Sequence, residues 1–292
     1  MTQSTEARSG ENDSRLTDLD LPVLVIKPSS GFRLLPLREL WEYRELLYFL
    51  VWRDVKVRYK QTVLGAAWAI IQPFMLMVVF ALFLGKLAGV PSDGLPYPLF
   101  AYAALVPWTL FASSLAGASD SLVGSSNLIT KVYFPRLILP VAAAGSFLLD
   151  FAIAFGLLVG MMVFYGVYPS IALAWLPLLT LFAVVAALAV GIWLAALNVR
   201  YRDVRYAVPF LTQLWLFATP VAYPSSIVPK TWQPLLGLNP MAGVVEGFRW
   251  ALLGTGEVPG AIILVSAAVT LGLLLGGLAY FQRTERTFAD VI

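Results

Sequence analysis

The side chains that most enzymes use for catalysis and metal binding are scarce in this sequence. Its 292 residues include no Cys and no His, which excludes thiolate and imidazole ligands, a Cys nucleophile and a Ser-His-Asp triad. Three acids in or beside the later apolar stretches are isolated: Asp120 and Asp203 each stand alone in a polar segment, and Asp150 lies inside an apolar stretch. Because paired acids are missing, we expect no catalytic residue, no metal site and no cofactor in this chain.

An energy source is also missing from the sequence. A P-loop needs the pattern G-x-x-x-x-G-K-[ST], whereas the single Gly-Lys pair, Gly85-Lys86, is followed by Leu87. Ion-coupled transporters place ionisable groups inside the membrane, but Asp150 is the one charge in the middle of an apolar stretch. A polar bond between packed helices, for example with Ser146, is its simplest role. We therefore expect a conduit that is driven by another protein.

Four cations are concentrated just before the first long apolar stretch. Arg53, Lys56, Arg58 and Lys60 fall within eight residues, and the uncharged residues 66–85 follow. Such a run can bind nucleic acid, fix the orientation of a membrane protein or dock another protein. The flanking segments are membrane elements, so we expect no nucleic-acid binding.

The composition is that of a membrane protein. Hydrophobic residues make up 59% of the chain and charged residues 13%, against about 25% charged residues in soluble domains. Crossing a bilayer takes about 20 largely apolar residues, and six segments qualify: residues 66–85, 95–118, 137–165, 171–197, 206–223 and 258–281. We predict an all-α membrane protein with six transmembrane helices.

The positive charges predict its orientation. Lys and Arg are enriched in cytoplasmic loops, and with both termini in the cytoplasm all of them except Lys86, Lys230 and Arg249 lie on that side. Residues 1–30 are polar, lack a signal-peptide pattern and are expected to form a disordered cytoplasmic tail. Residues 31–292 then form one membrane domain.

Three further segments are too short or too polar to cross. Residues 37–54 predict an amphipathic helix in the membrane plane, whose apolar face comprises Leu40, Tyr43, Leu46, Leu47, Leu50 and Val51. Residues 119–140 can form a short cytoplasmic helix with an apolar face made by Leu122, Leu128, Ile129 and Val132. Residues 224–254 contain two half-apolar stretches interrupted by Pro and Gly, which is typical of re-entrant or interfacial helices.

Several stretches together resemble one family. Five stretches are similar to the permease subunits of ABC-2-type transporters that export polysaccharides, O-antigen exporters above all. They are RDVKVRYKQTVLGAAWAIIQPF, NLITKVYFPR, LNVRYRDV, SSIVPKTWQPLLGLNPM and EGFRW. The likeness extends from about residue 37 to the C-terminus, with the stretches in order and compatibly spaced. Teichoic-acid and capsule exporters are relatives.

The resemblance implies a working unit and a cargo. Two permeases and two ATPase subunits assemble in the bacterial inner membrane, and the ATPases bind ATP and Mg²⁺. A glycan on a polyprenyl pyrophosphate lipid then passes to the outer side along the permease dimer interface, which is lined mainly by the first and fifth spans. The cytoplasmic connection carries a coupling helix that docks on the ATPase, here Ser121, Leu122, Asn127, Leu128, Ile129 and Lys131.

The same resemblance suggests where this cargo would be bound. Sugars stack on aromatic rings without a fixed register, and a conduction path needs weak, repeated binding. The first and fifth spans offer a candidate stacking set: Trp68, Phe74, Phe210, Trp215, Phe217 and Tyr223. The anionic pyrophosphate needs cations near the cytoplasmic leaflet, and the run Arg53, Lys56, Arg58 and Lys60 lies at that depth.

Other functions have distinct signatures. An ABC-2 permease for another cargo, such as teichoic acid, capsule, lipid or drug, would have the same architecture and differ in its neighbouring genes. A secondary transporter would export without an ATPase. A membrane enzyme would need the acid pairs, His or Cys that this sequence lacks. The sequence itself does not identify the sugar or the polymer length.

Overall fold

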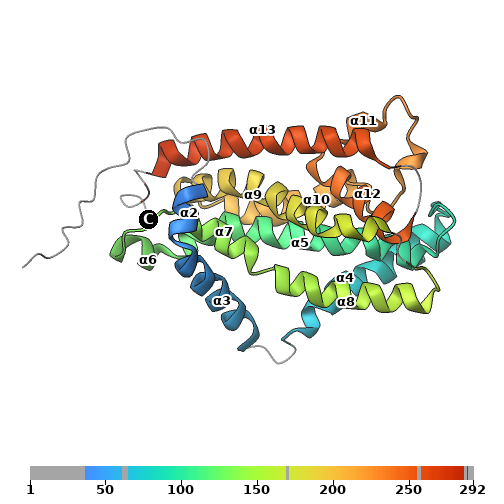
Figure 1. Ribbon diagram of the computed structural model, residues 1–292, viewed down its shortest axis with the longest axis horizontal. Helices are drawn as coiled ribbons and strands as arrows, with labels where there is room; N and C mark the ends of the chain where they lie inside the picture. Colours follow the sequence, from blue (N-terminus) through green and yellow to red (C-terminus); the bar gives the residue numbers. More distant parts are fainter. Residues whose placement is uncertain (1–36, 61–64, 169–170, 255–257, 286–287, 289–292) are drawn as a thin grey trace, which may run out of the picture. The chain divides into compact units, whose positions relative to one another are not determined.

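The structure is a computed structural model that describes residues 37–60, 65–168, 171–254, 258–285 and 288. All of these residues belong to one compact unit, Arg33–Ile292. Within the described ranges every regular element is a helix, and no strand is present (Figure 1). The predicted disordered tail, residues 1–30, lies outside the described residues.

Five helical segments of the described chain are long and apolar enough to cross a membrane. They are Ala67–Leu87, Tyr97–Gly124, Ile138–Phe164, Ile171–Arg200 and Gly260–Thr284. The first combines α4 (Ala67–Phe80) with the π-helical η1 (Ala81–Leu87), and the second is α5 (Tyr97–Gly124). The fourth combines the 3-10 turn η2 (Ile171–Trp175) with α9 (Leu176–Arg200), and the fifth is α13 (Gly260–Thr284). These segments coincide with five of the six predicted spans.

The remaining predicted span, residues 206–223, contains a shorter helix. α10 (Val204–Ala218) has 15 residues, which is about 22 Å at 1.5 Å per residue, whereas a hydrocarbon core is about 30 Å thick. Its backbone becomes extended at Thr219. Hydropathy overestimated the helix because residues 219–223 are apolar but not helical.

α5 is the central helix of the protein. Most of its residues are buried, and it packs on α4, α9 and α12 (Pro240–Leu253). The contact with α9 is close because Gly191 has no side chain: a Cβ atom there would lie 2.8 Å from the Cβ of Ala118. Small residues allow such an approach between membrane helices.

The third span is broken near one end. It consists of α7 (Ile138–Gly145) and α8 (Leu148–Phe164), separated by Ser146 and Phe147. The backbone carbonyl of Ala144 accepts a hydrogen bond from Ser114 Oγ at 3.2 Å, and that of Ser146 accepts one from Arg58 Nη1 at 3.3 Å. Side chains from two other helices therefore satisfy carbonyl groups at the break.

The predicted amphipathic segment forms two helices, α2 (Leu37–Glu42) and α3 (Arg44–Lys60). α3 packs against α7, and α2 and α3 lie beside α7 and α6 (Ser126–Lys131) in Figure 1. All six residues of the predicted apolar face belong to, or pack against, one hydrophobic cluster: Leu40, Tyr43, Leu46, Leu47, Leu50 and Val51. The apolar face thus contacts the protein, while Trp41 and Tyr48 are exposed.

The segment between α10 and α13 contains one substantial helix. It starts with the short turns η3 (Ser225–Ile227) and α11 (Gln233–Leu236) and continues with the 14-residue α12. Asn239 caps α12 by accepting a hydrogen bond from Met241 N at 3.0 Å, and Gly254 ends it with a φ of 65°. Most of α12 is buried against α5, α9 and α13.

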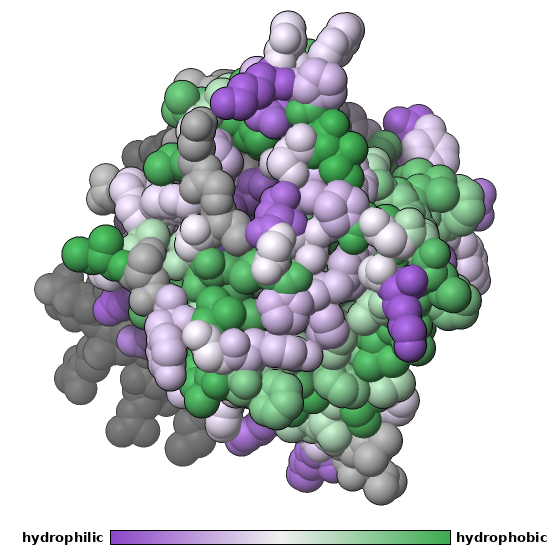
Figure 2. All heavy atoms as spheres, turned by 90° about the vertical axis from the view of Figure 1, so that its right-hand side faces the viewer, coloured by the Kyte–Doolittle hydropathy of each residue, from purple (hydrophilic) through white to green (hydrophobic). Residues whose placement is uncertain are grey.

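The two ends of the described helices differ in polarity. Figure 2 views the end where α8 finishes and α5 begins, and it shows separate hydrophilic groups among hydrophobic and weakly polar ones. At the other end, Arg205 pairs with Asp120 at 2.6 Å, and Arg136 N bonds to Glu285 Oε1 at 3.2 Å. The end of α5 therefore meets the start of α10, and Arg136 in the connection before α7 meets Glu285 at the end of α13.

Candidate functional site

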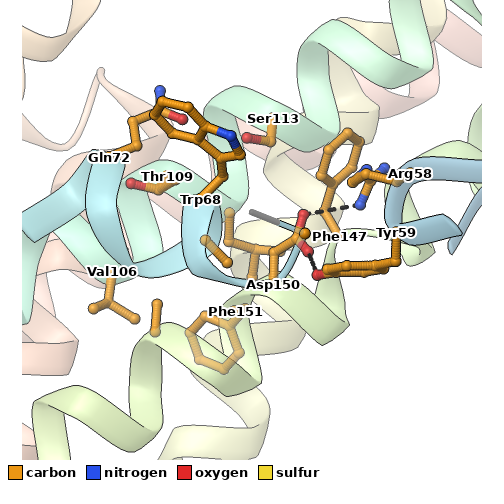
Figure 3. Close-up of a pocket in the computed structure, with 14 residues that line it drawn as sticks. Arg58, Tyr59, Trp68, Gln72, Val106, Thr109, Ser113, Phe147, Asp150 and Phe151 are labelled. Atoms are coloured by element: carbon orange, nitrogen blue, oxygen red, sulfur yellow. Dashed lines mark hydrogen bonds and ion pairs between the residues drawn. The ribbon is translucent and has the colours of Figure 1, made fainter. Parts of the chain in front are cut away.

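Arg58, at the end of α3, contacts the break in the third span through several polar groups. Its Nη1 donates to Asp150 Oδ2 at 2.8 Å (Figure 3). Its Nη2 donates to Ser146 Oγ at 2.9 Å. Its guanidinium lies 3.8 Å from the centre of the Phe147 ring. Arg58 is therefore an anchor between α3 and the α7–α8 break, and Asp150, which has no basic neighbour in sequence, has a cationic partner.

Tyr59 completes this cluster. Its hydroxyl donates to Asp150 Oδ1. Burial, reinforced by this hydrogen bond and by the negative charge of Asp150, raises the pKa of Tyr59 to about 12, because both effects favour the neutral phenol. Both carboxylate oxygens of Asp150 therefore have donors from α3.

The other members of the predicted gate have no such partners in the third span. Arg53 pairs with the adjacent Asp54 at 2.9 Å, and Lys56 Nζ lies 5.2 Å from the centre of the Trp52 ring. Lys60 is exposed. The basic run therefore divides into a positioning residue, Arg58, and three exposed cations that a soluble or lipid anion can reach.

The predicted coupling segment comprises the end of α5 and α6. Ser121 Oγ donates to the Ala118 carbonyl at 2.7 Å within α5. Leu122 and Ile129 are buried in the cluster that also receives α3, and Leu128 packs against the same cluster. Three members of the predicted apolar docking face therefore contact the protein itself.

A different face of α6 remains accessible. Asn127, Thr130 and Lys131 are exposed, and Val132 and Tyr133 follow with 53% and 73% of their surface exposed. The coupling role predicted for this segment stays a prediction, and within it Leu122 and Ile129 are buried against the protein itself. Of the predicted coupling residues, Asn127 and Lys131 have the exposure that docking requires.

The aromatic residues of the predicted stacking set fall into two groups. Trp68, Phe210 and Phe217 are exposed, with 54%, 63% and 58% of their surface accessible. Phe74, Trp215 and Tyr223 are partly buried and pack against the main hydrophobic cluster. The exposed group comes from α4 and α10, the two helices that the resemblance assigns to the path.

Trp215 has a defined packing role. Its ring meets that of Phe111 edge to face at 5.1 Å, and its Nε1 donates to Asn239 Oδ1 at 2.9 Å. Asn239 is also the cap of α12. Trp215 therefore joins α10 to α5 and to the start of α12.

A second polar cluster surrounds Arg249 of α12, whose side chain is 3% exposed. Its Nη1 donates to the Pro220 carbonyl at 2.5 Å, and its Nη2 to the Val221 carbonyl at 2.6 Å. It lies 3.6 Å from the centre of the Phe100 ring and pairs with Glu246 at 3.2 Å. Arg249 thus fixes the non-helical residues after α10 to α5 and α12.

Comparison with known proteins identifies the family. The sequence profile of the ABC-2 type transporter family matches residues 45–253, which include all of α3 except Arg44, the α7–α8 break, α10 and α12. The chain belongs to the ABC-2 type transporter family. The two polar clusters and the exposed face of α6 are therefore features of an ABC-2 membrane protein.

Similar proteins include export permeases and a transport protein. The O-antigen export system permease protein RfbA of Myxococcus xanthus is 33% identical over 259 residues, which cover 87% of this chain and 98% of the relative. RfbA of Klebsiella pneumoniae is 28% identical over 253 residues, covering 85% and 95%. The polysialic acid transport protein KpsM of Escherichia coli is 24% identical over 235 residues, covering 80% and 91%.

Sequence reasoning missed the pairing of the charged residues. Asp120 stands alone in sequence but pairs with Arg205, 85 residues later, and Asp150 pairs with Arg58, 92 residues earlier. A lone acid in a span is a signal that a partner exists. Which residue is the partner can be determined only from the folded structure.

Proposed function

We propose that this ABC-2 protein is the permease subunit of an ATP-driven exporter that moves a polyprenyl-pyrophosphate-linked polysaccharide of the O-antigen type across the bacterial inner membrane. The observation that carries the proposal is the 33% identity to an O-antigen export permease over nearly the whole length of both chains. The chain is a non-catalytic subunit, and ATP and Mg²⁺ are bound by a separate ATPase.

The proposed topology has six spans and both termini in the cytoplasm. α10, together with residues 219–223, constitutes the fifth of the six spans, and α11 and α12 are re-entrant from the outer side. α2 and α3 lie in the cytoplasmic interface. The grouping of basic connections at one end of the described helices supports this orientation through the positive-inside rule.

The working unit is a homodimer with two ATPase subunits. We assign ATPase docking to the exposed face of α6, with Asn127 and Lys131 as contacts, because these side chains are accessible while Leu122 and Ile129 are not. Force on α6 would reach α3 through the hydrophobic cluster that both helices share. This continuity gives a physical route from the ATPase to the membrane entrance.

Cargo enters near the end of α3 and leaves along α4 and α10. Arg53, Lys56 and Lys60 attract the pyrophosphate, and Arg58 holds α3 against the third span. The exposed rings of Trp68, Phe210 and Phe217 then stack on successive sugars. Exposed aromatic rings are suited to this task because each contact is weak and independent of register.

Deletion of the gene tests the proposal directly. We expect lipid-linked polysaccharide to accumulate on the cytoplasmic side and to disappear from the cell surface, with export restored by the intact gene only when its ATPase is active. Normal surface polysaccharide in the deletion strain contradicts the cargo assignment. Export that continues after the ATPase is inactivated contradicts the ATP-driven mechanism.

A capsule-type polysaccharide is the second candidate cargo, because the polysialic acid transport protein KpsM aligns with 80% of this chain. The lipid attached to the accumulated glycan distinguishes the two candidate cargoes. Mass spectrometry of the material that accumulates in the deletion strain distinguishes polyprenyl pyrophosphate from another lipid anchor.

A further inference from the structure

The cavity at the start of α4 has a set of uncharged side chains in its lining. Trp68 and Gln72 come from α4, and Thr109 and Ser113 come from α5. The members of each pair are four residues apart, so they lie on the same face of their helix. α4 and α5 are in contact, and Figure 3 shows the four side chains together on one side of the pocket, apart from Arg58. Two helix faces therefore meet at one cavity.

The polar groups of this set have hydrogen-bonding capacity to spare. Within the described part of the chain, neither the Gln72 amide nor the Ser113 hydroxyl makes a hydrogen bond to another residue. Thr109 Oγ1 donates to the Leu105 carbonyl at 2.8 Å and keeps lone pairs that can accept. Gln72 is exposed, and Thr109 and Ser113 are half-buried. A ligand in the cavity can therefore reach an amide and two hydroxyl groups, which together donate and accept.

The charged residues of the cavity compensate each other. Arg58 pairs with Asp150 at 2.8 Å, and the other oxygen of Asp150 accepts a hydrogen bond from Tyr59. The cavity therefore offers no uncompensated charge to an anion or to a cation, and removing an ion from water without a partner of opposite charge is unfavourable. The ligand that matches this lining is polar and uncharged.

An aromatic ring and buried apolar side chains complete the lining. Trp68 is 54% exposed, so its ring is accessible to a ligand, and Val106, Leu110 and Ala154 form the buried part of the wall. A pyranose ring matches this combination, because it has apolar C–H faces and a rim of polar substituents. The cavity volume is about 220 Å³, below the about 300–1,000 Å³ of pockets for drug-sized ligands. It fits one sugar ring and not a chain of them.

The cavity lies next to the cations that are proposed to attract the pyrophosphate. Lys60 ends α3, and Trp68 lies in the first turn of α4, the next helix of the described chain. Tyr59, the neighbour of Lys60 in sequence, lines the cavity itself. A pyrophosphate at Lys60 therefore places the sugar that is bonded to it at this cavity.

We propose that this cavity is a subsite for the single sugar that is bonded to the pyrophosphate of the cargo. The sugar stacks on Trp68, its polar substituents bond to Gln72 and Ser113, and Thr109 accepts a further hydrogen bond. This inference rests on the proposed function, because it takes the cargo to be a lipid-linked glycan. Hydrogen bonds at fixed positions select which glycan begins transport, whereas the exposed rings of α10 contact the sugars that follow without a fixed register.

Binding of short cargo analogues tests the subsite. The probes are farnesyl diphosphate and its glucose, galactose and N-acetylglucosamine esters, titrated into the full-length permease with its ATPase in nanodiscs. At least one sugar-bearing probe should bind about tenfold more tightly than farnesyl diphosphate, through two or more hydrogen bonds and the ring contact. Gln72→Leu and Ser113→Ala should each lower that preference about fivefold, the size expected for one hydrogen bond. The affinity for farnesyl diphosphate and the unfolding temperature should not change.

Gln213→Leu is the matched control, because Gln213 is an exposed glutamine of α10 that does not line the cavity. It should keep the full preference. An equal loss in this control, an unchanged preference in both cavity variants, or equal binding of all probes by the wild type overturns the subsite and leaves the exporter assignment intact. Absence of binding by every probe contradicts the subsite and the entrance cations together. The proposed function is tested separately by the gene deletion, in which normal surface polysaccharide contradicts the cargo assignment itself.

Discussion

Arg58 Nη1 lies 2.8 Å from Asp150 Oδ2, which joins the helix that precedes the first span to the break in the third. The contact brings a cation from the basic run and an acid from an apolar span into one partly buried pair. It explains how Asp150 is tolerated in the third span, because charged groups inside spans pair with other groups of the protein.

Arg58→Ala should destabilise the protein by about 1–3 kcal/mol. Removing one partner of a buried pair leaves an uncompensated charge and costs about 3–5 kcal/mol, and partial exposure of both side chains reduces that cost. Thermal unfolding in detergent measures the effect. Arg53→Ala is the control, since its Asp54 partner is adjacent on the same helix, and equal effects of the two substitutions would contradict the anchoring role.

The raised pKa of Tyr59 predicts that the free energy of unfolding depends on pH. Its pKa is about 12 in the folded protein and about 10 when unfolded, so between these values the unfolded chain loses the proton first. The stabilisation is complete below pH 10 and is lost as the pH rises toward 12. Tyr59→Phe should unfold with a weaker pH dependence in this window. Parallel curves for both proteins would show that folding does not raise the pKa of Tyr59.

Negative charges introduced on the exposed face of α6 should disconnect the ATPase. In the variant Asn127→Glu/Lys131→Glu we expect at least a tenfold loss of ATPase co-purification, while membrane insertion and the unfolding temperature stay unchanged. Ile129→Asp is the informative comparison, since it places a charge in the hydrophobic cluster and should lower stability. Undiminished co-purification of the double variant would place the docking surface elsewhere.

The three exposed cations of the basic run should matter for export and little for stability. Replacing Arg53, Lys56 and Lys60 together by Gln should slow export about 100-fold, because each of the three cations near the leaflet contributes about 1 kcal/mol to attraction of an anionic head. The readout is the rate at which glycan appears on the cell surface. Arg44→Gln, an exposed position at the start of α3, should export normally, and an equal defect there would argue against a localised gate.

Exposed and packed aromatic residues should respond differently to truncation. Phe210→Ala and Phe217→Ala should slow export severalfold at unchanged stability, as expected for stacking on sugars. Trp215→Ala should cost about 3–5 kcal/mol in stability, since it also removes the contacts with Phe111 and Asn239. Leu264→Ala, exposed on α13, is the control. Normal export in both Phe variants would exclude these rings from the path.

Composition and periodicity predicted the elements better than their contacts. Runs of apolar residues located five spans, and the 100° spacing of Leu46, Leu50 and their neighbours located the face of α2 and α3 that packs on the protein. The same periodicity identified an apolar face around Ile129 but not what covers it, because a buried face and a docking face have the same sequence pattern. The predicted span at residues 206–223 extends beyond α10, because hydropathy does not show that residues 219–223 are not helical.

The site was less predictable for a related reason. Arg58 and Asp150 are each recognisable as unusual in their own segments, yet their pairing depends on how α3 meets the third span. Arg249 was the clearest omission. A lone Arg on the side with few positive charges was a usable signal, because a cation that does not contribute to topology needs another role.

The Arg249 cluster also constrains how α10 can move. At one end, Arg249 holds the carbonyls of Pro220 and Val221 from within the protein. At the other end, α10 is tied by the Arg205–Asp120 pair, whose side chains are 51% and 46% exposed, and such exposed pairs contribute about 0–1 kcal/mol. The end of α10 near Arg249 is therefore held firmly and the end near Arg205 only weakly. We expect α10 to pivot about the Arg249 cluster, with the larger displacement at the Arg205 end.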